Sequence, residues 1–310
     1  MIVSRPENII IDDLFIKTQI PPFPHYIHLK LEGFSFTNSI KIKPALQMIE
    51  SLEQEGRLTV NNTLIESSSG NLGLALSMIC ASKGYRFICV SDPNISPQTI
   101  GLIKAYGTEL IIIDKRDANG GFLASRIALI NEKLREDPSL IWLNQYANPN
   151  NPLAHYDHTA RHIADVFPHP NYLFIGSGTT GTLGGVSQYF KEHSPQTHII
   201  AVDTEGSVTF GTPAGLRRIP GLGTSTPPKI SEKVLYDDLM IIKEIDTITM
   251  CRRLAKRGLL LGGSTGTVMS AVAQRLPSIA EDAVIVAISP DMGDRYIDTI
   301  YNDEWVASHF

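Results

Sequence analysis

Three glycine-rich loops carry the residues best suited to binding an anion. Each loop follows an apolar run and precedes a helical pattern, and they occupy residues 67–73, 176–182 and 262–267. Glycine lets the backbone approach a ligand closely, and the start of a helix presents free N–H groups to a negative charge. A helix cap alone would also explain the serines of the first loop. Three such loops in one chain predict that they converge on one ligand in a cleft.

The second loop is compatible with two cofactors. Gly176, Gly178 and Gly181 match the G-x-G-x-x-G pattern of dinucleotide-binding loops, and Asp203 ends the next apolar run. A nicotinamide oxidoreductase is therefore one alternative. Against it, the threonines among residues 179–182 suit a terminal phosphate, and half of the chain precedes a loop that normally opens its domain.

A single phosphate and a reactive lysine together indicate pyridoxal phosphate. Lys41 follows an apolar run at residues 26–31 and stands at the predicted start of a helix. A helix N-terminus disfavours the ammonium form and lowers the pKa of a lysine, which helps the amine to bind an aldehyde. Lys30 and Lys43 are its local competitors, and the alternative for Lys41 is an ordinary surface lysine.

The loops are set in an alternation of strands and helices. Apolar runs predict strands at residues 26–31, 63–66, 86–90, 109–113, 140–143, 172–175, 198–202 and 283–288. Helical spacing predicts helices at residues 71–83, 97–106, 121–135, 182–193, 247–256 and 265–274. Strands that alternate with helices of this length form parallel sheets covered on both faces. We therefore predict an α/β protein with two domains, joined near residues 145–152, and a cleft between them.

Composition excludes several classes of function. The 310 residues include 27 basic and 32 acidic side chains, so there is little electrostatic attraction to nucleic acid. No apolar stretch reaches the roughly 18 residues of a membrane span. The N-terminus lacks the regions of a signal peptide, and the dispersed cysteines, Cys80, Cys89 and Cys251, favour a reducing cytoplasm and should fill the core. We interpret the histidines of residues 155–162 as a solvated or partly packed helix face, and we expect no metal site.

Six segments, taken in their order along the chain, resemble the cysteine synthase family of fold-type II pyridoxal phosphate enzymes. They are the lysine motif Ser39-Ile40-Lys41, the carboxylate loop at 68–72, the segment 145–149, the phosphate cup at 178–182, the pyridine loop at 262–266, and the strand end at 290–296. Two features differ from the family pattern. The Asp-Arg pair that usually follows the lysine is Ile42-Lys43 here, and the usual N-terminal Thr-Pro-Leu strand is not recognisable.

The resemblance implies a tryptophan synthase β-like fold of parallel twisted sheets flanked by helices. We expect a smaller domain at residues 36–143 and a larger one that combines residues 1–35 with 144–310. Lys41 should bind the cofactor and move the substrate's α-proton, and Ser264 should face the pyridine nitrogen and leave it neutral. The other cofactor-binding residues implied are Asn71, Gly178, Thr179, Thr180, Gly181 and Thr182. The implied substrate-binding residues are Ser68, Ser69, Gly70, Gln145 and Tyr146.

Within this family, segments such as 120–127, 206–211 and 219–223 are most similar to siderophore-pathway synthases that join O-phospho-L-serine to L-glutamate. The expected reaction is β-replacement, giving N-(2-amino-2-carboxyethyl)-L-glutamate, a precursor of 2,3-diaminopropionate. We predict that Arg217 recognises the donor phosphate, with Arg126 as the alternative carrier or as the residue facing glutamate. A cysteine synthase that uses sulfide and a catalytically silent paralogue that acts as a binding partner are the alternatives. The family also implies a cytoplasmic homodimer.

Overall fold

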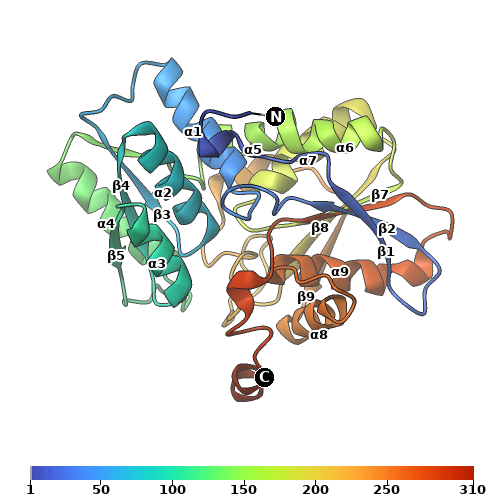
Figure 1. Ribbon diagram of the computed structural model, residues 1–310. Helices are drawn as coiled ribbons and strands as arrows, with labels where there is room; N and C mark the ends of the chain where they lie inside the picture. Colours follow the sequence, from blue (N-terminus) through green and yellow to red (C-terminus); the bar gives the residue numbers. More distant parts are fainter. Residues whose placement is uncertain (1) are drawn as a thin grey trace.

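The computed structural model describes residues 2–310 and contains two sheets, which lie on opposite sides of the view in Figure 1. The six-stranded sheet has the strand order β1 (Phe15–Gln19), β2 (Tyr26–Leu31), β10 (Ile285–Ser289), β7 (Tyr172–Gly176), β8 (His198–Thr204) and β9 (Asp238–Ile242). Only β1 is antiparallel to its neighbour. The four-stranded sheet is wholly parallel, in the order β5 (Glu109–Ile112), β4 (Arg86–Ser91), β3 (Thr63–Ser67) and β6 (Leu140–Trp142).

Helices cover both faces of the larger sheet (Figure 1). One face carries α5 (Asn150–Ala154), the π-helical turn η2 (His155–Ala160), α6 (Arg161–Val166) and α7 (Gly181–His193), and the other carries α8 (Glu244–Ala255) and α9 (Gly263–Arg275). Because side chains alternate along a strand, Leu173 and Ile175 of β7 pack with α7 while Phe174 packs with α9. The sheet is therefore the middle layer of three, as its near-continuous apolar strands predict.

The smaller sheet is covered in the same way. Helices α1 (Ile42–Gln54), α2 (Asn71–Lys83) and α3 (Pro97–Ala105) pack on one face, and α4 (Leu123–Glu136) packs on the other. Helix α2 is apolar on every side, which is typical of a helix that is covered all round. The remaining helices are α10 (Asp303–His309) and the short 3-10 turns η1 (Pro6–Asn8), η3 (Lys229–Lys233), η4 (Leu276–Ser278) and η5 (Asp294–Tyr296).

Each sheet has a point at which the strand order reverses. In the smaller sheet the chain runs from β3 to β4 and β5 and then returns to place β6 on the other side of β3. In the larger sheet it runs from β7 to β8 and β9 and then returns to place β10 on the other side of β7. Ligands bind outside the carboxyl ends of the strands at such points. The residues that follow β3, β6, β7 and β10 are therefore the expected site.

The predicted alternation of strands and helices is confirmed, and the strand at 26–31 and the helix at 71–83 have the predicted bounds. The sequence analysis missed β1 and β9, the edge strands of the larger sheet, which are only partly buried. Strand β1 stands where no Thr-Pro-Leu strand could be recognised. The domain boundaries at 36 and 143 stay a prediction. Within residues 2–310, no helix has the length and apolar character that crossing a membrane requires.

Candidate functional site

The loop after β7 forms a cup of polar groups at the start of α7. Thr180 adopts a left-handed backbone with φ 69°, a conformation that is uncommon for threonine and is often found at functional sites. Gly181 lies so close to the Asn151 amide that a side chain there would collide with it. Asn151 Nδ2 donates to Thr179 Oγ1 at 3.1 Å, which leaves the Thr179 hydroxyl hydrogen free for another acceptor. The buried hydroxyls of Ser177 and Thr180 have no hydrogen-bond partner among the described residues. Unpartnered donors at a helix N-terminus fit a phosphate group.

Lys41 lies at the N-terminus of α1 and lines a cavity of about 230 Å³ between the two sheets. Burial lowers the pKa of Lys41 to about 8, although the nearby Asp291 carboxylate opposes this shift. The sequence analysis expected a lowered pKa from the helix N-terminus. The direction agrees, but the largest cause is burial. An amine with this pKa is partly neutral near pH 7 and can bind an aldehyde.

The loop after β3 faces Lys41 across the same cavity, which Ser68, Ser69, Gly70 and Asn71 all line. Ser68 Oγ accepts hydrogen bonds from the backbone N–H of Gly73 at 2.9 Å and of Gly70 at 3.3 Å, so this serine does act as a helix cap. Ser69 lies at the cavity with its hydroxyl available, which suits the predicted binding of a carboxylate. The cap and the binding loop are thus the same segment.

Gln145 follows β6, the strand that lies on the opposite side of β3 from β4. Its Nε2 donates to the carbonyl of Ser67 at 2.8 Å, and its backbone N–H donates to Glu66 Oε2 at 3.2 Å. Burial raises the pKa of Glu66 to about 7, although backbone N–H groups of Ser67 and Gln145 stabilise its charged form. Glu66 therefore holds the two loops of the smaller sheet together, and Tyr146 lines the cavity beside Gln145.

Asp291, which follows β10, joins the two sheets at the site. Its Oδ2 accepts a hydrogen bond from Asn71 Nδ2 at 2.8 Å and one from the Tyr296 hydroxyl at 2.6 Å. Burial raises the pKa of Asp291. The sequence analysis quoted this strand end without giving Asp291 a role. The signal was its place at the carboxyl end of a parallel strand, where site residues gather.

The glycine loop that opens α9 lies on the far side of the same space. Ser264 is buried in the first turn of α9, and a side chain at Gly221 would collide with its hydroxyl. Gly221 lines the Lys41 cavity, so the Ser264 hydroxyl lies just behind the cavity wall. Of the phosphate cup, Gly178 and Thr179 line the cavity directly. The three loops do converge on one place, as their number predicted.

A second cavity, of about 160 Å³, adjoins the first and is rich in arginine. Arg126 lines both cavities, is only 7% exposed, and has its Nη1 3.4 Å from Asp92 Oδ2. The Nε and Nη1 atoms of Arg126 have no hydrogen-bond partner within residues 2–310. Arg217 lines only the second cavity and donates to the carbonyl of Leu222 at 3.2 Å. Arg218, which lines both cavities, is a further cation beside Arg126 and Arg217.

The residues chosen from the sequence therefore fit pyridoxal phosphate on structural grounds. Lys41 would hold its aldehyde, and the loop at 178–182 would hold its phosphate. Both groups border one cavity, and Ser264 lies behind the wall of that cavity.

The three cysteines are buried free thiols, and burial raises the pKa of each to about 12.

Solved structures with similar folds and sequences come from related enzymes. A hydrogen sulfide-producing enzyme from Fusobacterium nucleatum is 32% identical, with a TM-score of 0.89 over 95% of this chain and 100% of its own. O-ureido-L-serine synthase is 28% identical, with a TM-score of 0.89 over 99% of this chain and 100% of its own. An O-acetylserine-dependent cystathionine β-synthase from Helicobacter pylori is 28% identical, with a TM-score of 0.90 over 97% of this chain and 100% of its own.

Residues 17–291 match the family model described as pyridoxal-phosphate dependent enzyme. This match spans most of the chain and includes Lys41 and the three glycine loops. The chain belongs to the pyridoxal-phosphate dependent enzyme family, has its fold-type II architecture, and is an enzyme that uses pyridoxal phosphate.

Proposed function

We propose that this enzyme replaces the β-substituent of an activated L-serine, and that it joins O-phospho-L-serine to L-glutamate to give N-(2-amino-2-carboxyethyl)-L-glutamate. The observation that carries the choice of substrates is the arginine-rich cavity beside Lys41. Both proposed substrates bring negative charge besides the α-carboxylate, and guanidinium groups bind phosphate and carboxylate in a bidentate manner.

Five residues in and behind the Lys41 cavity have a part in this proposal. Bound pyridoxal phosphate supplies an electron sink that acidifies the α-proton of an amino acid. Lys41 Nζ holds the cofactor and, once released, takes the α-proton and later returns one. Ser69, Asn71 and Gln145 bind and orient the substrate's α-carboxylate. The neutral hydroxyl of Ser264 leaves the pyridine nitrogen unprotonated, which favours loss of the β-substituent over transamination.

The placement of the two arginines favours the alternative assignment of the sequence analysis over its first choice. Arg126 reaches the cavity that contains Lys41. Its Nε and Nη1 make no hydrogen bond within residues 2–310, although Nη1 lies 3.4 Å from Asp92 Oδ2, so we assign Arg126 to the donor phosphate. Arg217 reaches only the neighbouring cavity, so we assign it to the side-chain carboxylate of the acceptor. A charge-assisted hydrogen bond contributes roughly 1.5–3 kcal/mol, about ten- to a hundredfold in specificity.

The test offers the enzyme O-phosphoserine or O-acetylserine with glutamate, other amino acids or sulfide, and identifies the products by mass spectrometry. Arg126→Ala should lower kcat/KM for O-phosphoserine about ten- to a hundredfold and leave kcat/KM for O-acetylserine nearly unchanged. Arg217→Ala should raise KM for glutamate instead. Arg161→Ala, on the exposed surface of α6 and paired with Asp157, is the control. If the donor ratio does not change in Arg126→Ala, this arginine does not recognise the phosphate.

A second candidate is sulfur chemistry, favoured by the likeness to a hydrogen sulfide-producing enzyme and to a cystathionine β-synthase. If the wild type prefers O-acetylserine and sulfide, the function is that of a cysteine synthase. A homodimer, a cytoplasmic location and a place in siderophore or related secondary metabolism stay predictions that rest on the family resemblance.

A further inference from the structure

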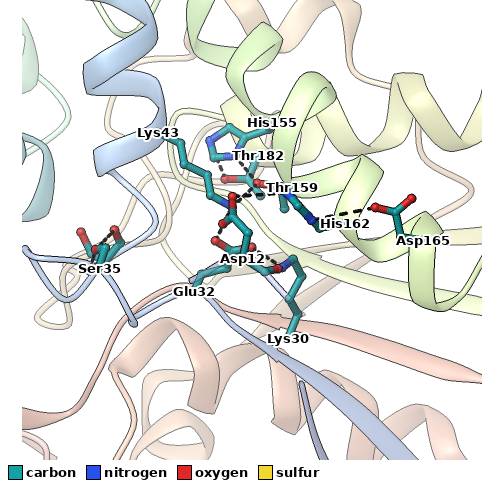
Figure 2. A network of polar contacts seen from close by, with 11 residues as sticks. Asp12, Lys30, Glu32, Ser35, Lys43, His155, Thr159, His162, Asp165 and Thr182 are labelled. Carbon is teal, nitrogen blue, oxygen red and sulfur yellow. Dashed lines mark hydrogen bonds and ion pairs between the residues drawn. The ribbon is translucent and has the colours of Figure 1, made fainter. Parts of the chain in front are cut away.

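A buried cluster of charges lies behind the phosphate cup (Figure 2). Lys43 is 4% exposed, and its Nζ lies 2.5 Å from Asp12 Oδ1 and 2.7 Å from Glu32 Oε2. Lys30 Nζ lies 3.0 Å from Glu32 Oε1 and also donates to the carbonyl of Asp12. His162 Nε2 lies 3.5 Å from Asp12 at the outer edge of the cluster. Two ammonium groups thus balance two carboxylates, and the cysteine synthase-like site uses none of these residues directly.

A chain of hydrogen bonds connects this cluster to the cup. Lys43 Nζ lies 3.3 Å from Thr159 Oγ1, and Thr159 Oγ1 lies 3.1 Å from His155 Nδ1. His155 Nε2 in turn lies 3.3 Å from Thr182 Oγ1, in the first turn of α7. Thr159 and His155 are both 0% exposed, so water does not compete for these contacts. Figure 2 shows these four side chains grouped beside the ion pairs of Lys43.

The chemistry of the groups allows the chain to run from Lys43 to Thr182. An ammonium can only donate, so Thr159 Oγ1 accepts from Lys43, and it can give its single hydrogen to His155 Nδ1. In that arrangement the one N–H of the neutral imidazole is on Nε2 and is donated to Thr182 Oγ1, whereas an N–H on Nδ1 would reverse both bonds to the ring. Burial, together with the positive charges of Lys41 and Lys43, lowers the pKa of His155 well below its ordinary value, so the ring is neutral.

We propose that Lys43 is a positioning residue that, through Thr159 and His155, makes the hydroxyl of Thr182 a hydrogen-bond donor to the cofactor phosphate. With its oxygen accepting from His155, Thr182 keeps its hydrogen for the cup. A phosphate dianion only accepts hydrogen bonds, and hydrogen bonds polarised along a chain strengthen one another. The inference rests on the assignment of residues 178–182 to the phosphate.

Thr159→Val tests the chain without disturbing the ion pairs, because valine keeps the shape of threonine and removes only the hydroxyl. The first measurement is the affinity of cofactor-free protein for pyridoxal phosphate and for pyridoxal, which lacks the phosphate. We expect pyridoxal phosphate to bind about tenfold more weakly, the value of one such hydrogen bond, and pyridoxal to bind as before. Thr197→Val is the matched control, since Thr197 is equally buried, is bonded to Ser194, and lies just before the amino end of β8, whereas the cup follows the carboxyl end of β7.

An equal loss for both ligands, or no loss for either, would overturn the proposal. If the wild type binds pyridoxal phosphate no better than pyridoxal, the phosphate cup itself is wrongly assigned, which is a different failure. The second measurement is the ¹⁵N spectrum of the His155 ring in the wild type. The proposal requires the proton on Nε2, and a proton on Nδ1 would reverse the chain and exclude it. Lys43→Met should weaken the binding of pyridoxal phosphate, whereas Lys43→Arg, which keeps a cationic donor, should retain most of the wild-type affinity.

Discussion

Lys41 should be the residue that reacts with pyridoxal phosphate, because a larger fraction of its amine is neutral than in an ordinary lysine. With a pKa of about 8, about a tenth of Lys41 is neutral at pH 7. An ordinary lysine of pKa 10.5 is neutral to only about 0.03%, so the reactive neutral fraction of Lys41 is roughly 300-fold larger. The Glu32 and Asp12 carboxylates outweigh burial and raise the pKa of Lys43, so this nearby lysine should be slower still.

The assay treats cofactor-free protein with pyridoxal phosphate, reduces the adduct with borohydride and maps it on peptides. The rate of labelling should rise about tenfold per pH unit up to pH 8 and then level off. In Lys41→Ala the label should disappear while the fold survives, and it should not move to Lys30, whose ammonium is paired with Glu32. Labelling of Lys30 or Lys43 in the wild type, or a rate that still rises at pH 10, would refute the reasoning.

Three further perturbations test the surroundings of Lys41. Asp291→Asn removes a negative charge that raises the pKa of Lys41, so the midpoint of the labelling profile should move below pH 8, and an unmoved midpoint would contradict the assigned contact. Ser264→Asp should keep the cofactor but protonate its ring, so transamination per turnover should increase; an unchanged product ratio would remove the role given to Ser264. Glu66 has a folded-state pKa of about 7, above its ordinary 4.5, so its contribution to stability is complete below pH 4.5 and is lost as pH rises to 7. Relative to Glu66→Gln, which cannot ionise, the wild type should lose about 3 kcal/mol of unfolding free energy over that range, measured by chemical denaturation; parallel profiles would show that burial does not raise this pKa.

The sequence predicted the loops of the site because each carries its own local signal. Glycines and hydroxyls at a junction between strand and helix are recognisable from neighbouring residues alone, and parallel sheets bring such junctions together. The edge strands β1 and β9 carry no such signal, because neither is followed by a glycine-rich loop. Hydrogen bonds between residues that are distant in sequence could not be predicted either. Asn71 and Asp291 are far apart in sequence, and nothing in their neighbouring residues indicates that their side chains meet.

The histidines of residues 155–162 show why a helical pattern can mislead. The sequence analysis interpreted them as a solvated or partly packed helix face, but residues 155–160 form a π-helical turn, which changes the angular step between residues. His155 consequently points inward and is fully buried, while His158 is exposed. The prediction was wrong for His155, and the buried chain to Thr182 follows from that difference.

Lys41 and Lys43 are two residues apart, yet the structure gives them opposite chemistry. Lys43 has two carboxylates, Asp12 and Glu32, within 2.7 Å of its ammonium, so it stays charged and can polarise a hydrogen-bond chain. Lys41 has only the field of Asp291, whose Oδ2 already accepts from Asn71 and from Tyr296, so burial prevails and its amine is partly neutral. At the position where the family pattern has arginine, Lys43 supplies a buried ammonium. One turn of chain thus supplies the amine for the aldehyde and, in the proposed chain of hydrogen bonds, the charge that orients the Thr182 hydroxyl toward the phosphate.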